Sequence, residues 1–105
     1  MNLEKNKPYR SKKVLNAAKD CPYCMNCGIP NDGTIVAAHY TGFRQHFFGK
    51  GMGQKCTDTA TAFLCHNCHT EMDGASMDSL HYRSEKFLFA IVKTHDYLFK
   101  EGIIK

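Results

Sequence analysis

Long hydrophobic runs are missing from this chain of 105 residues. No stretch of about 18 apolar residues occurs, which excludes a membrane-spanning helix. Residues 1–20 also lack the apolar run of a signal peptide, so we expect a reducing cytoplasm as the compartment. Internal repeats and low-complexity tracts are absent too, which excludes repeat architectures and leaves one small folded domain as the simplest organisation.

Acidic residues are scarce at the start of the chain. Glu4 is the single acid among the first 19 residues, which hold six of the 14 Lys and Arg side chains. The whole chain has a formal net charge of +4, which favours anionic partners such as DNA. We therefore predict a basic N-terminal arm with a short helix over residues 1–20 and a single domain over residues 21–105. A solvated, frayed terminus is the alternative for the arm.

Cysteine, by contrast, is abundant, and four of the six cysteines form two pairs of identical spacing. Two residues separate the members of each pair, and this spacing lets neighbouring thiolates bind one tetrahedral zinc ion. A small domain with a thin core is stabilised by such a staple. We predict one structural zinc ion, held across an insertion of 37 residues by Cys24, Cys27, Cys65 and Cys68. Disulfides or buried thiols are the alternatives.

The other two cysteines leave one choice open. Cys21 precedes Cys24 at the same two-residue spacing, so it is an alternative ligand of the zinc ion. Gly28 directly follows Cys27 and favours the Cys24 pair with Cys27, because glycine eases the tight turn that brings backbone N–H groups to sulfur. Cys56 lies outside any pair and is expected to be an unliganded thiol.

Turn residues and hydrophobic periodicity predict an α+β domain. Ser11 is expected to cap the first helix, and the glycine-rich segment 40–58 is expected to form a mobile binding loop. The predicted elements are a helix over 11–19, strands over 34–39 and 60–64, a short helix over 69–73 and a long helix over 84–100. The long helix carries an apolar stripe that is expected to complete the core, formed by Phe87, Leu88, Ile91, Leu98 and Phe99.

A second candidate site consists of two metal ligands, His69 and Asp73, and a nearby base, His39. His69 and Asp73 are four residues apart, so they would share one face of the short helix and could bind a second ion. His39, at the end of the first strand, would supply a neutral imidazole that deprotonates water. These groups are the minimum equipment of a metal-dependent phosphodiesterase. The alternative is that a histidine beside a zinc knuckle only bonds a sulfur or fills the core.

Three motifs carry a family resemblance. They are Ala38-His39, the segment Gly49-Lys-Gly-Met-Gly53 followed by Lys55 and Asp58, and Cys65-His-Asn-Cys68-His69 with Asp73-Gly74. Together they resemble the small HNH-type nucleases encoded in phages and prophages, and the similarity extends from Arg10 over nearly the whole chain. The resemblance implies a ββα-metal (His-Me finger), treble-clef-like core, with His39 as general base and His69 and Asp73 as metal ligands.

The sequence departs from the family pattern at two places. Many HNH nucleases have an acidic or histidine ligand before the base, where this chain has Ala38. The usual central asparagine is also missing, and Asp58, Thr59 and Thr61 stand in that stretch. Both departures concern the groups around His39, so they bear on catalysis rather than on the fold.

The leading hypothesis is a metal-dependent DNA endonuclease of HNH type that hydrolyses phosphodiester bonds in the cytoplasm of a bacterial host. Its second ion would be magnesium, manganese, nickel or zinc. Loop residues Arg44, Lys50 and Lys55, with the basic arm, are expected to contact DNA phosphates. The alternative is a non-catalytic zinc-binding module that grips nucleic acid by charge. A third hypothesis, an adaptor that self-associates through the long helix, requires the apolar stripe to be exposed.

Overall fold

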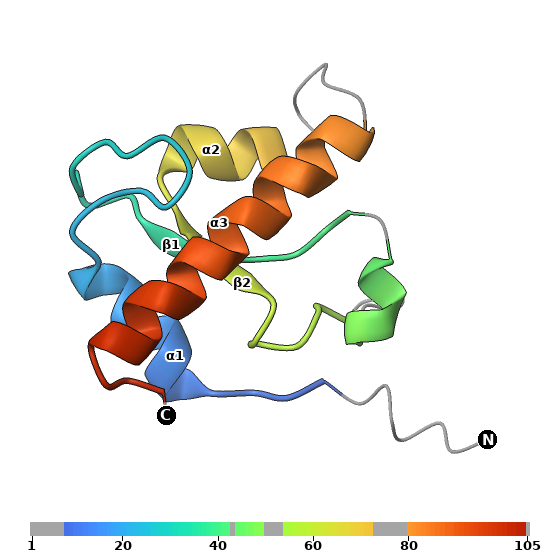
Figure 1. The fold of residues 1–105 in the computed structure, drawn as a ribbon, viewed down its shortest axis with the longest axis horizontal. Coiled ribbons are helices and arrows are strands. Elements are labelled where there is room, and N and C mark those ends of the chain that lie inside the picture. Colours follow the sequence, from blue (N-terminus) through green and yellow to red (C-terminus); the bar gives the residue numbers. More distant parts are fainter. Residues whose placement is uncertain (1–7, 43, 50–53, 73–79, 105) are drawn as a thin grey trace.

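Residues 8–42, 44–49, 54–72 and 80–104 are described by a computed structural model of the chain (Figure 1). Within this part of the chain, helices surround a sheet of two strands. In chain order the elements are α1 (Lys12–Asn16), the 3-10 helix η2 (Ala17–Asp20), β1 (Val36–His39), the 3-10 helix η3 (Gln45–Phe48), β2 (Thr61–Leu64), α2 (His66–Thr70) and α3 (Leu80–Lys100).

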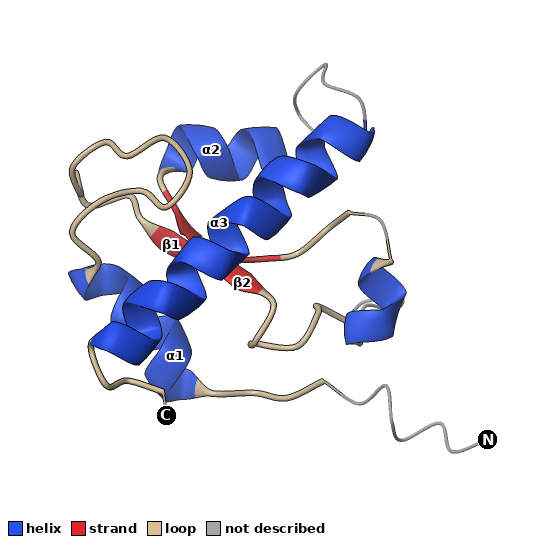
Figure 2. Cartoon of the chain, viewed as in Figure 1, coloured by secondary structure: helices blue, strands red, loops and turns tan. Residues whose placement is uncertain are grey.

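The two strands form an antiparallel pair in which Val36 lies opposite Leu64 and His39 lies opposite Thr61. Helix α2 follows β2 almost directly, and α3 runs diagonally across the sheet and packs on β2 (Figure 1 and Figure 2). This arrangement confirms the predicted α+β class, the two strands and the long C-terminal helix. It also places His39, as predicted, at the end of the first strand.

Local signals fix where the helices begin. Ser11 caps α1 as predicted, because its Oγ accepts the N–H of Val14 at 3.2 Å. Cys65 has an extended backbone and stands at the cap of α2, so this helix begins at His66 rather than at the predicted His69. His69 therefore lies in the last turn of α2. The long helix likewise begins at Leu80, earlier than the predicted residue 84.

The described part of the predicted arm packs on the rest of the chain. The N–H of Asp58 donates to the carbonyl of Tyr9 at 2.8 Å, and the N–H of Tyr9 donates to Thr57 Oγ1 at 3.0 Å. Helix α1 and η2 then add three buried residues to the core, Val14, Ala17 and Ala18. Residues 9–20 thus share one core with the cysteine-rich part, and the domain boundary at residue 20 stays a prediction.

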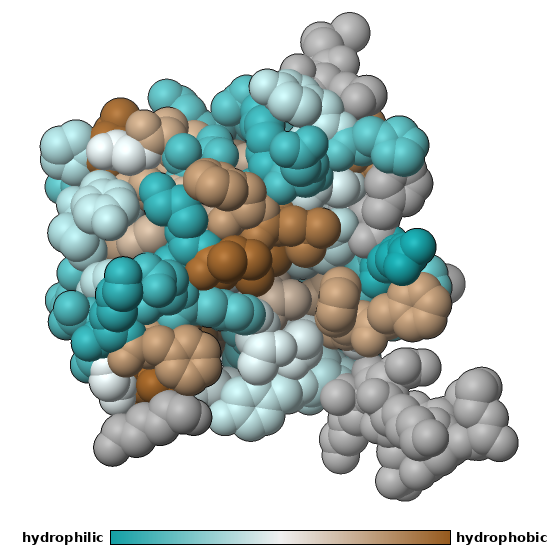
Figure 3. Space-filling view, in the orientation of Figure 1, coloured by the Kyte–Doolittle hydropathy of each residue, from teal (hydrophilic) through white to brown (hydrophobic). Residues whose placement is uncertain are grey.

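The apolar stripe predicted along α3 is buried only in part. Phe87, Ile91 and Leu98 are buried, whereas Leu88 is 43% exposed and Phe99 is 56% exposed. The prediction is wrong for Leu88 and Phe99 because each residue turns a helix by about 100°, which carries them off the face of their preceding neighbours. Small residues complete the buried face instead, namely Ser84, Ala90 and Thr94. Figure 3 shows the apolar patch that results over the middle of α3, and self-association through it stays a prediction.

The chain leaves β1 through a tightly packed passage. Tyr40 is fully buried, and its ring meets the edge of Phe87 at a centroid distance of 5.3 Å. A Cβ atom at Gly42 would lie 2.5 Å from both Ser84 Oγ and Tyr40 Oη. Because no side chain fits there, glycine is required, and the start of the segment after His39 is held against α3.

Thr94 joins α3 to the sheet through one fully buried hydroxyl group. Its Oγ1 donates to the carbonyl of Ala90 at 2.7 Å and accepts the N–H of Phe63 at 3.1 Å. We expect Thr94→Val to lower the free energy of unfolding by about 1–3 kcal/mol, because valine leaves the N–H of Phe63 buried without a partner. Urea unfolding measures this change. Thr70→Val is the control, since Thr70 makes the same bond to a carbonyl four residues earlier at an exposed position; equal losses would contradict the prediction.

Candidate functional site

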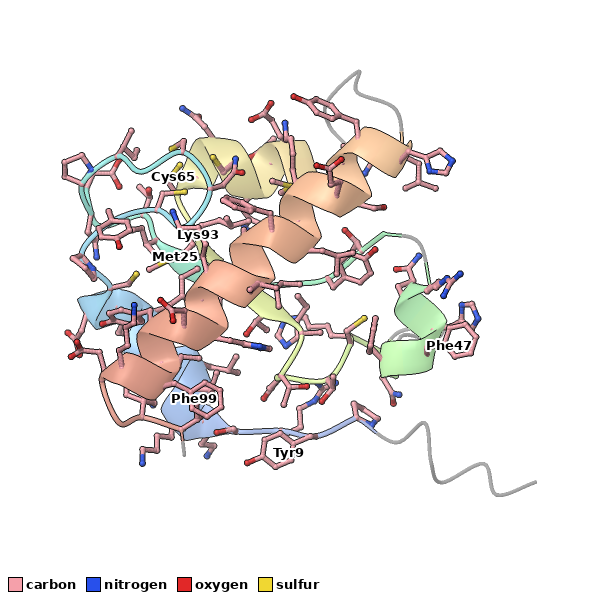
Figure 4. The ribbon with its side chains drawn as sticks, in the orientation of Figure 1. Tyr9, Met25, Phe47, Cys65, Lys93 and Phe99 are labelled. Atoms are coloured by element: carbon pink, nitrogen blue, oxygen red, sulfur yellow. The ribbon has the colours of Figure 1, made fainter. Side chains whose placement is uncertain are left out.

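Four cysteine sulfurs form a compact cluster between the segment before β1 and the start of α2 (Figure 4). The Sγ atoms of Cys24, Cys27, Cys65 and Cys68 all lie within 4.8 Å of one another, and those of Cys27 and Cys65 are 3.8 Å apart. Sulfurs at the corners of a tetrahedron around zinc, with bonds of about 2.3 Å, stand about 3.8 Å apart. The cluster therefore has the size and the donors to hold one metal ion.

Two local turns bring these sulfurs together. The N–H of Gly28 donates to the carbonyl of Cys24 at 3.0 Å, and Gly28 has a φ of 81°, in the left-handed region that glycine tolerates best. This is the turn that Gly28 was predicted to ease. The N–H of Met25 then donates to the carbonyl of Phe63 at 2.9 Å, which ties the first turn to β2. Cys65 and Cys68 follow at the cap and in the body of α2.

Asn26 is a part of this centre that sequence reasoning missed. Its backbone N–H points at Cys24 Sγ at 3.4 Å, and its side-chain Nδ2 donates to Cys68 Sγ at 3.3 Å. The N–H of Cys65 adds a second donor to Cys24 Sγ at 3.4 Å. Donors around a thiolate orient it and stabilise its charge. A polar residue inside a Cys-x-x-Cys turn was the available signal.

The pKa values of the thiols reflect both their burial and the N–H donors around them. Burial raises the pKa of Cys24, but the N–H groups of Cys65, Cys27 and Asn26 lower it to about 7. Burial raises the pKa of Cys68, and the neighbouring sulfurs raise it further, so a negative charge on all four sulfurs is unfavourable by itself. A divalent cation supplies the opposite charge that four thiolates need, and the donor set fits such a cation.

The other two cysteines lie outside this cluster. Cys21 is fully buried and its Sγ donates to the carbonyl of Tyr23 at 3.1 Å. Cys56 is also buried, and its Sγ donates to the carbonyl of Tyr40 at 3.1 Å. None of the six cysteines forms a disulfide. The geometry therefore groups Cys24 rather than Cys21 with the other three sulfurs, as Gly28 after Cys27 predicted.

His39 forms a second polar site at the other end of the sheet. Its Nε2 lies 2.7 Å from Oδ1 of Asp58, which precedes β2. The side chain of Asp58 is 1% exposed and that of His39 is 13% exposed, so the carboxylate is buried while the imidazole reaches the surface. Thr61 lies opposite His39 in the sheet. Its hydroxyl donates to the carbonyl of Asp58 at 2.9 Å and stabilises the turn over residues 58–61.

Asp58 is held from the opposite side by the N-terminal segment. The backbone N–H of Ser11 donates to its Oδ2 at 2.6 Å, and Nη1 of Arg10 lies 3.2 Å from its Oδ1. Burial raises the pKa of Asp58, but the hydrogen bonds from His39 and Ser11, with the charge of Arg10, bring it below its ordinary value. In the sequence, Asp58 belongs to a family motif and stands in the stretch where an asparagine is usual, but no partner is predicted for it. A single acid between the loop and β2 was the signal for its partnership with His39.

The end of α2 lies close to the chain that follows His39. Thr41 Oγ1 donates to the carbonyl of Met72 at 3.1 Å, so the residues after α2 pass beside the end of β1. His69, in the last turn of α2, is half-buried. Asp73 lies outside the described residues. Among the residues that are described, the four cysteines are the only group of three or more potential metal ligands, so the second metal site stays a prediction.

The predicted phosphate-binding residues have different surroundings. Arg44 is exposed, with a φ of 64° that is uncommon for a residue other than glycine, and it directly precedes η3. Lys55 is also exposed, whereas Lys50 lies outside the described residues. Arg10 of the arm is engaged within the chain, because its guanidinium donates to the carbonyls of Lys55 and Cys56 at 2.9 and 2.5 Å. Its contacts are structural.

Comparisons with protein-family models, with curated proteins and with solved structures gave no match to this chain. The chemistry of the two sites therefore rests on their own geometry. In the described ranges, no helix combines the length and the apolar character that crossing a membrane requires.

The four-cysteine cluster predicts one bound metal ion per chain. We expect Cys68→Ser to lose this ion, with a fall in affinity larger than the roughly 10- to 100-fold typical of outer-shell changes, because a ligand itself is removed. Elemental analysis of purified protein and titration with a chromogenic chelator measure the loss. Cys21→Ser is the matched control, since it alters a buried cysteine outside the cluster and keeps a donor for the carbonyl of Tyr23. Equal metal loss from both variants would contradict the assignment.

Proposed function

We propose that this chain is a metal-dependent DNA endonuclease of the HNH type, which hydrolyses phosphodiester bonds. The observation that carries the proposal is the hydrogen bond between Thr41 and Met72, because it brings the end of α2 beside the strand end that bears His39. This contact supports the proposal because an ion held from the end of α2 would then lie near His39, as metal-assisted hydrolysis requires. The family resemblance of the sequence points the same way.

In this proposal the two metal sites have separate tasks. Zinc is the ion that fits the four cysteines, since an all-sulfur tetrahedral set is typical of structural zinc. His69 and Asp73 would hold a second divalent ion, which would supply positive charge to a phosphate oxygen and to the leaving 3′-oxygen. The zinc site holds the start of α2 in place, and through it the position of His69 relative to β1.

His39 takes the part of the general base. An attacking water molecule gives its proton to the imidazole while its oxygen bonds to phosphorus and the bond to the 3′-oxygen breaks. The 13% exposure of the His39 side chain allows a water molecule to reach the ring, and the bond to Asp58 holds the ring still. These two properties support the role of His39 as a base.

Exposed cations give the DNA a place to bind. Arg44 and Lys55 lie on the segment between the strands, and the chain has a net charge of +4. Contacts of this kind are made to phosphates, so they position DNA without selecting a sequence, and they weaken as salt concentration rises. Binding that does not weaken with salt would contradict the role of these two residues.

Cleavage of supercoiled and branched DNA by the zinc-loaded protein tests the proposal, with magnesium, manganese, nickel or zinc added. We expect His39→Ala to lower the cleavage rate by about 10²- to 10⁴-fold, because the water loses its base. His46→Ala is the control. His46 is an exposed histidine whose ring centroid lies 4.4 Å from that of Phe47, and it has no contact with Asp58 among the described hydrogen bonds. If neither the wild type nor the variants cut any substrate, while all bind DNA in a salt-dependent way, the non-catalytic zinc-binding module replaces the nuclease.

A further inference from the structure

Three nitrogen atoms lie within hydrogen-bond distance of the two carboxylate oxygens of Asp58. Oδ1 lies 2.7 Å from His39 Nε2 and 3.2 Å from Nη1 of Arg10, while Oδ2 accepts the backbone N–H of Ser11 at 2.6 Å. Arginine and a backbone amide can only donate, so both oxygens must act as acceptors. A proton on Oδ2 would face the N–H of Ser11, so the ionised carboxylate suits this site better than the protonated acid.

This arrangement decides which nitrogen of His39 carries a proton. An ionised carboxylate only accepts hydrogen bonds, so the ring nitrogen that faces Oδ1, Nε2, must be the donor. In the neutral imidazole the other nitrogen, Nδ1, is then unprotonated and can take a proton. The lowered pKa of Asp58 agrees with this assignment, because it keeps the carboxylate ionised at neutral pH.

The same geometry explains why an aspartate, and not an asparagine, suits this chain. An asparagine side chain has one oxygen, so its NH₂ group would face either the N–H of Ser11 or the pair of donors from His39 and Arg10. Donor would then meet donor in a site that is 1% exposed, which is unfavourable. The position before β2 therefore requires two acceptor oxygens.

The N-terminal segment completes the Asp58 site, although Ser11 and Asp58 are 47 residues apart in the sequence. Ser11 holds Oδ2, and Arg10 clamps both Oδ1 and the carbonyls of residues 55 and 56. Tyr9 pairs with the backbone of Asp58 and with Thr57. Residues 9–11 thus form hydrogen bonds with each of residues 55–58, the segment that carries Asp58.

We propose that Asp58 is a positioning residue that fixes His39 as the Nε2–H tautomer, with Nδ1 presented as the base, and that residues 9–11 hold Asp58 for this task. Its effect on DNA cleavage rests on the proposed nuclease function, whereas its effect on the tautomer of His39 does not. The two parts can therefore be tested separately.

The tautomer is measured by NMR on zinc-loaded protein labelled with ¹⁵N in histidine. We expect the wild-type spectrum to show His39 protonated at Nε2, and Asp58→Ala to shift His39 toward a mixture of both tautomers. His95 is the internal control, because its Nε2 bonds the carbonyl of Thr59 and not Asp58. Protonation of His39 at Nδ1 in the wild type would overturn the proposal without any reference to activity, and without any variant that has to fold.

Cleavage kinetics test whether Asp58 acts through His39. Asp58→Ala should reduce the rate by about 100-fold, the low end of general-base effects, and should cause no further loss in a His39→Ala background. Asp58→Asn should lie between Asp58→Ala and the wild type. His46→Ala is again the control, since His46 is an exposed residue with no contact to Asp58 among the described hydrogen bonds.

The outcomes separate the two proposals. If the tautomer is as expected and the wild type cuts no DNA, the nuclease function fails and the positioning role stands. If the wild type cuts DNA and Asp58→Ala, folded by circular dichroism, keeps both rate and tautomer, the positioning role fails and the nuclease stands. A further loss from Asp58→Ala in the His39→Ala background would also overturn it, because Asp58 would then act on something other than His39.

Discussion

The contact between the Cys24–Cys27 turn and the start of α2 determines where most of the domain lies. The four sulfurs join two segments separated by 37 residues, and β2 enters the cluster directly at Cys65. A chain of 105 residues buries too little apolar surface to hold such distant segments by packing alone with a wide margin. An ion bound to the cluster would therefore contribute to the free energy of folding and would help to fix the position of α2.

A second junction of a different kind lies at the opposite end of the sheet. Here a buried carboxylate, Asp58, joins the N-terminal segment to β1 and β2 through hydrogen bonds rather than through sulfur. A buried charge is costly unless it is paired and its oxygens are satisfied, and all of the partners around Asp58 are donors. The sheet is thus fixed by sulfur at one end and by oxygen at the other, and the surface histidine stands at the oxygen end.

The sequence predicted the parts that depend on neighbouring residues. The spacing of the cysteines, the cap at Ser11 and the strand that ends at His39 each follow from short local patterns, and each is found in the structure. Helix α2 begins before the predicted His69 because Cys65, a predicted zinc ligand, is also the cap residue of this helix. The buried stripe of α3 is narrower than predicted, because Leu88 and Phe99 each follow a buried residue by one position and so lie on another side of the helix.

The grip of residues 9–11 on Asp58 could not be predicted in the same way. Its partners are 47 and 48 residues apart, and no period or spacing in the sequence connects them. Asn26 was missed for a related reason, since its side chain reaches a sulfur 42 residues away. Polar contacts between distant segments depend on the finished fold, whereas hydrophobic periods and metal-ligand spacings are already visible in the chain.

The four sulfurs of the metal centre differ in their access to solvent. Cys24, Cys65 and Cys68 are buried, and Cys27 is exposed. A competing chelator, an oxidant or a protein that delivers metal therefore meets the sulfur of Cys27 first, while the other three ligands are still shielded. Exchange of an ion held by this cluster would therefore begin at Cys27, the one ligand that solvent reaches directly.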